Sequence, residues 1–287
     1  MDNEGLKVQH QELLFTLFGL YGHDAHEEFP VSVLMELLSA VGIKPQATRS
    51  LISRLKRSGT LINRRVGTES RYRLADAGAD TFRHDDQQIF APVRSTTNAS
   101  LVLAIFSVPE TQRHRRYELR TLLAGLGFGM VASGVAIGPQ FVVDHAIESL
   151  RERGLQEYVD YFRADYIPTD DIRAKVAQWW DLEALDSQYT EFLRLYVGQL
   201  EQWQNKVEAA SNDADARRAM EQEAFAFYVP MLTRWRRFPY RDPNLPFEYL
   251  PDGWKAPQAK QVFLALHELL ALAAERYAGR LLGVRAG

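Results

Sequence analysis

Apolar residues in the first sixty positions recur every three or four residues, which is the period of one face of an α-helix. The pattern predicts helices over residues 11–21 and 30–41 and a third over 45–58. Gly42 can end the second helix, because glycine readily adopts the left-handed conformation found after a helix. Pro45 can begin the third, since the first helical position needs no backbone N–H. Two helices joined by so short a connection are typical of a helix-turn-helix unit.

A period of two follows this helical region. Residues 61–65 and 70–74 have the alternating pattern of strands, and the sequence VGTE at 66–69 favours a turn between them. Because successive side chains of a strand point to opposite faces, one face of the second strand carries apolar residues and the other carries arginines. Such a ribbon after a helix-turn-helix unit has the form of a wing. We therefore predict a winged helix-turn-helix domain over residues 1–86.

The middle of the chain has a mixed pattern. A nearly continuous apolar run at 100–108 is typical of a strand covered on both faces. After it the pattern predicts a helix, two short strands rich in glycine, a second helix and a last strand, at 113–126, 128–138, 142–153 and 157–164. This order is that of a ferredoxin-like unit. We place the domain at 98–168, after a linker at 85–98 that collects Ser, Thr, Pro and Asn.

The last part of the chain has a helical pattern. Thr169 or Asp170 can cap a helix that runs toward Trp180. Further helices are predicted at 184–208, 214–237 and 257–282, with an aromatic and proline-rich loop at 236–254. Pro230 is expected to kink the second of these helices, because proline removes a backbone donor. The fold class is therefore α+β and multidomain, with an α-helical C-terminal domain over 169–287.

Positive charge is concentrated in residues 44–73. This segment contains nine basic residues and one acid, Glu69, so it carries +8 in a chain of net charge −3. The remaining residues therefore carry −11. Segregated positive charge is what a polyanion-binding surface needs. A solvated basic face is the simpler alternative, and the arrangement of the residues argues against it.

The helix predicted at 45–58 separates apolar from polar side chains. Thr48, Leu51, Ile52 and Leu55 fall on one side and are expected to pack inward. The other side is hydrogen-bonding at its centre and cationic at its edges, which suits base edges in a DNA groove and phosphates along its rims. The predicted DNA-binding residues are Gln46, Arg49, Ser50, Ser53, Arg54 and Arg57 of this helix and Arg64, Arg65 and Arg71 of the ribbon. A winged helix used for protein contacts is the alternative.

Composition limits the class of protein. The chain contains no cysteine, which excludes disulfides, thiolate nucleophiles and cysteine zinc sites and fits a reducing compartment. The first ten residues lack the apolar stretch of a secretory signal. No run approaches the roughly 20 apolar residues that span a bilayer. We therefore expect a cytoplasmic protein without a membrane partner.

The run GLGFG at 125–129 resembles a nucleotide-binding loop. It follows a helix instead of a strand, however, and no helix begins directly after it, so the geometry that cradles a phosphate is absent. Glycines of turns and strands are the better interpretation.

Residues that could carry catalysis do not form a recognisable set. His23 and His26 have a spacing that could chelate a metal on a helix, but their neighbours indicate a loop, so we predict no metal site. Glu221 and Glu223 face different sides of a helix and are expected to be solvated. No catalytic motif is assembled, so we predict that the protein is not an enzyme and needs no cofactor.

Aromatic and cationic residues near the C-terminus suggest a second kind of site. Tryptophans beside several arginines could hold an acyl or aryl group while binding phosphates. The candidate effector-binding residues are Trp179, Arg234, Arg236, Arg237, Arg241 and Trp254. Burial in the core is the alternative for each aromatic residue.

The chain resembles the PaaX family of bacterial repressors of phenylacetate catabolism over nearly its whole length. The resemblance rests on ATRSLISRLKRSGTLINRRVGTESRYRLADAG, LLAGLGFG, WWDLEALDSQYTEFLRLY and, most specifically, RRFPYRDPNLPFEYLPDGW. It implies an N-terminal winged helix, a central domain similar to Cas2 that supports dimerisation, and a helical C-terminal domain. The recognition-helix positions of the family fall on Arg49, Ser50 and Arg54, and its wing arginines on Arg64, Arg65 and Arg71. The chain departs from the family pattern at Pro230, which falls inside an expected helix.

The resemblance also implies a mechanism. A homodimer binds a double-stranded operator, and an aryl-acyl-CoA, phenylacetyl-CoA in the namesake proteins, releases it. A metal-dependent nuclease is the rival hypothesis, because Cas2-like enzymes place an acidic metal ligand near the end of the first strand. Here no carboxylate follows that strand before Glu110. A constitutive architectural DNA-binding protein without an effector is a further alternative.

Overall fold

The computed structural model describes residues 8–22, 28–75, 89–90, 101–167, 171–239 and 241–283. The chain forms two compact units, each built from segments that are far apart in the sequence. The first unit comprises Met1–Ala91, Glu191–Arg236 and Gln258–Gly287. The second comprises Pro92–Thr190 and Arg237–Pro257. The mixed α+β class predicted from the sequence is confirmed, with helices and two antiparallel sheets in the described residues.

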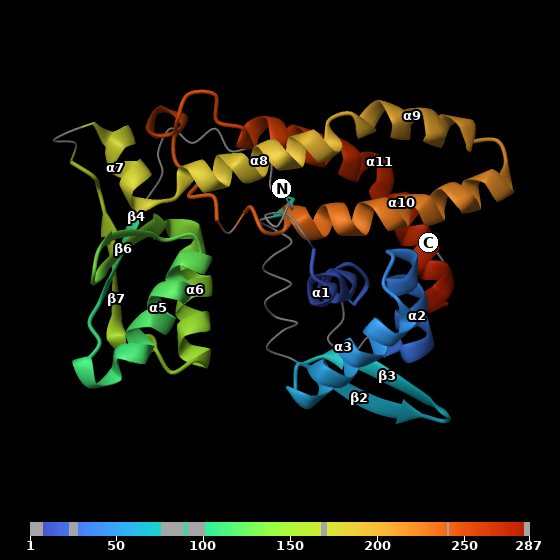
Figure 1. Ribbon diagram of the computed structural model, residues 1–287, viewed down its shortest axis with the longest axis horizontal. Coiled ribbons are helices and arrows are strands. Elements are labelled where there is room, and N and C mark those ends of the chain that lie inside the picture. The colour runs from blue at the N-terminus through green and yellow to red at the C-terminus, as the bar shows by residue number, and fades with distance from the viewer. Residues whose placement is uncertain are drawn as a thin grey trace. The chain divides into compact units, whose positions relative to one another are not determined.

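Among the described residues, the N-terminal part of the first unit has the helices α1, α2 and α3 and a small sheet (Figure 1). In chain order its elements are α1 (His10–Tyr21), β1 (Phe29–Pro30), α2 (Val31–Ala40), α3 (Pro45–Arg57), β2 (Leu61–Val66) and β3 (Glu69–Leu74). The predicted β2–β3 pair is present, and β1 adds a third antiparallel strand in the order β1-β3-β2. The sequence analysis missed β1, because two residues, one of them proline, give no alternating pattern.

The connection between α2 and α3 is as short as predicted. Gly42 has a φ of 87° and its N–H donates to the Ser39 carbonyl, so it ends α2 in the left-handed conformation. Pro45 is at the start of α3, where its missing N–H costs no hydrogen bond. The buried residues of α3 are the four that the helical period placed inward, Thr48, Leu51, Ile52 and Leu55.

The first unit also contains C-terminal helices. These are α9 (Gln199–Ala209), α10 (Ala214–Trp235) and most of α11 (Ala256–Leu282), while α8 (Leu182–Tyr196) contributes residues to both units. The helix α10 packs on α1 and α2. Between α1 and α10, the buried Thr233 hydroxyl donates to Thr16 Oγ1 at 2.9 Å. Tyr21 stacks on Phe225 at 6.2 Å between ring centroids. Residues 217 positions apart therefore share one core.

One sequence expectation about these helices is wrong. The helix predicted at 184–208 is two helices, α8 and α9, which end and begin on either side of Val197 and Gly198. Glycine and a β-branched residue both have low helix propensity, so the chain turns there. α10 is continuous from Ala214 to Trp235, as the predicted range 214–237 indicated, and the kink stays a prediction at Pro230. Its flanking residues Val229, Met231 and Leu232 are buried, and tertiary packing of this kind can outweigh the cost of proline.

Glu221 also differs from the expectation of a solvated acid. Its side chain is only 5% exposed and lies against two arginines of α11, Arg280 and Arg276. An unpaired carboxylate would be costly at such a position, so the arginines explain its burial. Glu223, in contrast, is exposed and forms an ion pair with Lys206.

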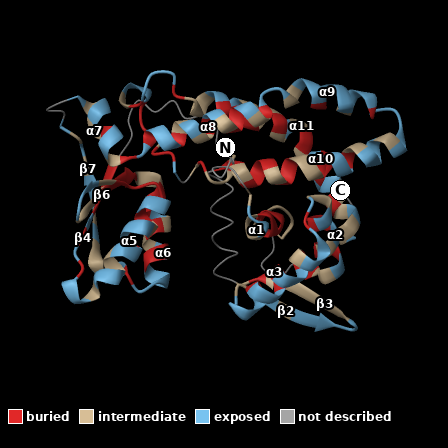
Figure 2. Ribbon diagram, in the orientation of Figure 1, coloured by how far each residue is buried: buried red, intermediate tan, exposed pale blue. Residues whose placement is uncertain are grey.

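The second unit is built on a four-stranded antiparallel sheet. Its elements in chain order are β4 (Leu101–Phe106), α5 (Arg113–Gly125), β5 (Gly129–Ala132), β6 (Val135–Pro139), α6 (Val143–Glu152) and β7 (Val159–Ala164). The strand order β5-β6-β4-β7 and the connectivity are those of a ferredoxin-like fold. The two helices cover one face of the sheet, where Ala104 and Phe106 meet Leu119 and Leu123. Figure 2 shows that α5 and α6 are buried on one side and exposed on the other.

The glycine run between α5 and β5 is a turn with close packing, as predicted. Gly127 has a φ of 86°, and its carbonyl accepts a hydrogen bond from the Trp180 indole at 2.9 Å. A Cβ on Gly129 would lie 2.7 Å from the Trp180 ring. The run therefore makes room for the Trp180 side chain, and it is followed by the strand β5, not by a helix.

The aromatic and proline-rich segment after α10 is held within the second unit by a buried hydrogen bond, ring stacking and exposed contacts of Arg173. The Tyr189 hydroxyl donates to Asp242 Oδ2 at 2.8 Å, and the Tyr189 ring stacks on Phe238 at 4.3 Å. Burial and the nearby Asp242 carboxylate raise the pKa of Tyr189 well above its ordinary value. Arg173 of α7 (Ile172–Trp179) donates to the Glu248 carbonyl and to Asp252. The most specific motif of the sequence thus has a structural role.

The helix α7 begins with a side-chain cap. Asp171 caps α7 by accepting from Arg173 N at 3.0 Å, whereas Thr169 and Asp170, the caps proposed from the sequence, lie outside the described residues. In the part of the chain that the structure describes, no helix combines the length and apolar character needed to cross a membrane.

Candidate nucleic-acid interface

The exposed face of α3 carries the residues that the sequence analysis selected. Its inward side is fixed by four buried residues, so the opposite side must face solvent. The exposed side chains on it are Gln46, Arg49, Ser50, Ser53, Arg54, Lys56 and Arg57. No acidic residue occurs between positions 44 and 57. All the charged side chains on this face are therefore cations, and hydroxyl and amide groups lie between them.

These side chains form almost no hydrogen bonds or ion pairs with other described residues. Among the described residues, only Arg54 has a hydrogen-bond partner, Gln11 Oε1, at a long 3.5 Å. Three of the cations, Arg54, Lys56 and Arg57, lie in the last turn of α3, where the helix dipole favours positive charge. Arg49 lies in the middle of the helix, so the dipole does not explain it. Its guanidinium is exposed and has no hydrogen bond or ion pair with any described residue.

The arginines of the β2–β3 ribbon divide between its two faces. In the antiparallel register Arg64 lies opposite Arg71, while Arg65 lies opposite Ser70. Paired residues project to the same face and sequence neighbours to opposite faces. Arg64 and Arg71 therefore share one face, and Arg65 projects from the other. The sequence analysis had grouped all three as one set.

Arg64 is bound by an acid that the sequence analysis did not single out. Its Nε lies 2.8 and 2.9 Å from the two carboxylate oxygens of Glu28, and Nη2 lies 2.8 Å from Oε2. This contact lowers the pKa of Glu28 and raises that of Arg64. The Glu28 side chain is only 11% exposed, whereas that of Arg64 is 68% exposed. The two residues are 36 positions apart, so no local pattern could have identified the pair.

The other two ribbon arginines differ in their surroundings. Arg65 is exposed, and its only contact among the described residues is a 3.4 Å hydrogen bond to the Gly67 carbonyl. Arg71 is half-buried, and its Nε has no hydrogen-bond partner among the described residues. Nearby, the acid Glu69 accepts from the Ser32 hydroxyl at 2.7 Å. Of the three ribbon arginines, Arg65 is the most available to an external anion.

The six candidate effector residues belong to two different units. Arg234 and Arg236 lie in the first unit, and Trp179, Arg237, Arg241 and Trp254 lie in the second.

Several of these residues have structural contacts. Arg234 donates to the Tyr196 hydroxyl at 2.8 Å, Trp254 is buried edge-to-face against Tyr189, and Arg241 donates to Gln188 at 3.2 Å. Burial raises the pKa of Tyr196 above its ordinary value, although the Arg234 guanidinium partly opposes this.

The residues proposed for metal chemistry gain no support. Glu110 lies just after β4, and its Oε2 is 3.0 Å from Arg116 Nη1, so its carboxylate is engaged by a cation. Among the described residues there is no group of three or more His, Cys, Asp or Glu side chains that could hold a metal ion. His23 and His26 lie outside the described residues.

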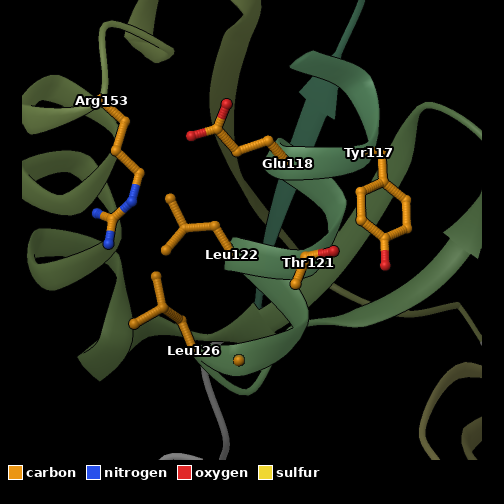
Figure 3. A pocket seen from close by; sticks show the side chains of 7 residues that line it. Tyr117, Glu118, Thr121, Leu122, Leu126 and Arg153 are labelled. Atoms are coloured by element: carbon orange, nitrogen blue, oxygen red, sulfur yellow. The ribbon is translucent and has the colours of Figure 1, made fainter. Parts of the chain in front are cut away.

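An open depression of about 500 Å³ lies on the second unit beside α5 (Figure 3). Figure 3 shows that Glu118 and Leu122 of α5 and Leu126, the residue after it, project toward Arg153, while Tyr117 lies on the other side of the helix. The remaining lining residues are Thr121 and Gly125. Arg153 donates to the Ser149 carbonyl at 2.8 Å, so one of its donors is already satisfied.

The fold and this surface define a multidomain α+β protein in which a helical unit with an exposed cationic helix is combined with a ferredoxin-like unit. Family models match three consecutive parts of the chain. They are described as "PaaX-like protein" over residues 9–78, "PaaX protein central Cas2-like domain" over 97–176 and "PaaX-like protein C-terminal domain" over 180–280. The chain belongs to the PaaX family.

Individual relatives agree with this assignment. The "Transcriptional repressor PaaX" of Escherichia coli (strain K12) is 23% identical over 270 residues, which covers 93% of this chain and 82% of the relative. Among solved structures, "Uncharacterized protein Rv0674 from Mycobacterium tuberculosis" matches with a TM-score of 0.50 and 23% identity. That match covers 92% of this chain and 95% of the other. At this identity it supports the fold alone.

Proposed function

We propose that this protein is a DNA-binding transcriptional repressor whose N-terminal 86 residues act as a winged helix-turn-helix. The observation that carries the proposal is the exposed face of α3, which is cationic and almost free of internal partners. Membership of the PaaX family and similarity to the E. coli transcriptional repressor PaaX support the same role.

In this proposal α3 lies in the major groove. Gln46, Ser50 and Ser53 face the base edges, which they can read by hydrogen bonds, while Arg49, Arg54 and Arg57 contact bases or the phosphates at the rims. Helix-turn-helix proteins place their second helix in the major groove.

The ribbon acts as the wing, and its arginines differ in whether they contact DNA or stabilise the wing. Arg65 contacts a phosphate, because it is exposed and carries only one weak internal hydrogen bond. Arg64 and Arg71 lie on the opposite face, where Glu28 compensates part of their charge. We therefore assign Arg64 mainly to the structure of the wing and Arg65 to DNA binding.

The protein acts as a homodimer on a palindromic operator. Two copies of α3 then enter successive major grooves, so half-sites are separated by one helical turn, about 34–36 Å, or a multiple of it. The metal-dependent nuclease is not proposed further, because Glu110 is paired with Arg116 and no metal-binding group occurs in the described residues.

An aryl-acyl-CoA such as phenylacetyl-CoA relieves repression. Its phosphates and aryl group require cations and aromatic residues. The candidates are Arg234 and Arg236 in the first unit and Trp179, Arg237, Arg241 and Trp254 in the second. Arg234 is the most informative of them, because it belongs to α10, and the adjacent Thr233 is hydrogen-bonded to Thr16 of α1. A ligand that binds one shape of this unit better than another biases the N-terminal helices. A coupling of about 1–3 kcal/mol weakens operator binding roughly 5- to 150-fold.

The DNA-binding part is tested by selecting duplexes that bind the full-length protein and comparing three variants on them. Arg54→Ala should relax base preference, whereas Arg65→Ala should weaken all duplexes alike and reduce the salt slope by about one. Arg194→Ala is the control, because this exposed arginine of α8 is paired with Glu191, far in sequence from α3. Equal effects of all three variants, or no salt-sensitive duplex binding, would contradict the proposal.

The effector part is tested with phenylacetyl-CoA. Calorimetry should show binding, and a mobility-shift assay should show release of the selected duplex. Absence of both would point to another inducer. Unchanged duplex binding across a series of acyl-CoA thioesters would favour a constitutive architectural protein.

A further inference from the structure

The helix α5 of the ferredoxin-like unit has an unusual charge distribution. Its first eight residues, RHRRYELR, contain four arginines and one histidine against one acid. The N-terminus of a helix carries the positive end of its dipole, where acids are stabilising and cations are not. No acidic residue occurs in the first turn of α5. The sequence therefore places Arg113, Arg115 and Arg116 in the first turn, where the helix itself disfavours cations, so each needs another explanation.

Two of these arginines have structural roles. Arg115 donates to the Gly154 carbonyl at 2.9 Å. Arg116 donates to the Val108 carbonyl at 2.8 Å and pairs with Glu110. The fold therefore explains these two cations and leaves Arg113 and Arg120 to be explained.

Arg113, Tyr117 and Arg120 form a stripe along the exposed side of α5. Their spacing of four and three residues places them on one face of a helix. The Arg113 side chain is 84% exposed and its only partner is Glu110, at 3.9 Å, while Tyr117 is 76% exposed. Arg120 is exposed and makes no hydrogen bond or ion pair with any described residue. Figure 3 shows Tyr117 on the side of α5 turned away from Arg153.

We propose that this stripe is a second phosphate-contact surface, which binds the backbone of duplex DNA. The proposal rests on the function proposed above. Seven residues of helix rise by about 10 Å, so the two arginines span roughly three phosphates of one strand. A tyrosine hydroxyl between them can donate to the intervening phosphate.

The composition of the stripe favours a phosphate backbone over a protein partner. Tyrosine and arginine are also enriched at protein interfaces, but the centre of such an interface is apolar and depleted in charge, whereas here both ends of the stripe are cations. The apolar side chains Leu122 of α5 and Leu126, which follows the helix, line the depression beside the stripe, and of the stripe only Tyr117 lines it with them. The stripe itself offers two guanidinium groups and one phenol, which bind phosphates without reading sequence.

The test measures binding of the full-length protein to a mixed-sequence duplex as a function of salt. Each phosphate contact adds about 0.9 to the slope of log K against log salt concentration, so Arg113→Gln with Arg120→Gln should lower the slope by roughly two per protomer. The charge-matched control is Arg151→Gln with Arg163→Gln, two exposed arginines of α6 and β7 in the same unit. This control should keep the wild-type slope. The lysine pair, Arg113→Lys with Arg120→Lys, should retain most of it.

A fourth variant, Arg49→Gln with Arg54→Gln, separates this inference from the proposed function. Loss of slope in the α3 variant alone would overturn the inference and leave the repressor proposal intact. Loss in the α5 variant alone would support the inference and overturn the role of α3. An equal decrease in slope for the α5 variant and its charge-matched control would mean that only the net charge of the protein matters, and would overturn the inference. A wild-type protein without salt-dependent binding would overturn both proposals.

Discussion

At the scale of single residues, Glu28 controls the electrostatics of the ribbon. Its carboxylate is hydrogen-bonded to Arg64, and the pKa of Glu28 is lowered by this contact and by the charges of Arg64, Arg71 and Arg73. A carboxyl group with a lowered pKa stabilises the fold above its ordinary pKa of 4.5, and the contribution is lost as the pH falls through the lowered value.

Glu28→Gln should therefore be less stable than the wild type at pH 7. The difference in urea midpoint should shrink as the pH falls below about 4.5 and vanish once Glu28 is protonated in the folded protein. Glu201→Gln is the control, because this exposed acid of α9 has no hydrogen bond or ion pair among the described residues. Equal midpoints for Glu28→Gln and the wild type at pH 7 would contradict the role assigned to Glu28.

Gly129 gives a second prediction at this scale. A Cβ there would lie 2.7 Å from Trp180 Cδ2 and 2.8 Å from the Trp179 carbonyl oxygen, so Gly129→Ala must displace the tryptophan or the strand. Overpacking of this kind costs about 1–3 kcal/mol. Gly125→Ala is the matched control, since its Cβ would meet no atom within 4 Å. Urea unfolding should separate the two variants, and similar stabilities would show that the Trp180 contact is adaptable.

At the scale of elements, the sequence pattern predicted the features that depend on neighbouring residues, such as the buried face of a helix. The helical period of α3 identified its four buried residues, because burial on one helix face follows directly from spacing. The exposed half of the candidate site, from Gln46 to Arg57, followed from the same pattern. The ribbon was predicted as a pair of strands, but the separation of Arg64 from Arg65 becomes clear only when the register is known.

Contacts between residues far apart in the chain could not be predicted from the sequence pattern. Glu28 meets Arg64 across 36 residues, and Thr16 meets Thr233 across 217 residues, so no periodicity could connect either pair. The break at Gly198 and the continuity of α10 through Pro230 reflect a balance between local propensity and packing that only the tertiary structure decides.

The packing of α1 on α10 can be tested through its buried hydroxyl pair. Thr233 Oγ1 contacts Thr16 Oγ1 at 2.9 Å and the Val229 carbonyl at 2.7 Å, and both threonines are buried. Thr233→Val leaves the Thr16 hydroxyl without this partner, which should cost about 1–3 kcal/mol. Adding Thr16→Val should recover part of the loss, because both polar groups are then removed. Additive effects in urea unfolding would indicate that the two helices do not share this contact.

At the scale of the whole molecule, the N-terminal helices share a core with the C-terminal helices, although the sequence suggests a separate N-terminal domain. Tyr21 of α1 stacks on Phe225 of α10, and burial raises the pKa of its phenol far above the ordinary value. Ile89 is buried, and its carbonyl accepts from the Trp235 indole and from Lys260, both at 3.2 Å. A fragment ending at residue 91 would expose Thr16, Tyr21 and Ile89 to water.

We therefore expect the fragment of residues 1–91 to be markedly less stable than the same segment in the full chain. Removing α10 and α11 exposes apolar surface worth about 25 cal/mol per Å², so the fragment should unfold at lower urea and bind a hydrophobic dye. Circular dichroism is the measurement of choice, because all five tryptophans lie after residue 178. Adding a second chain that carries residues 191–283 should restore stability if the shared core is the cause. A fragment as stable as the intact protein would mean that the N-terminal helices form an independent domain, and α10 could not then transmit an effector signal to them.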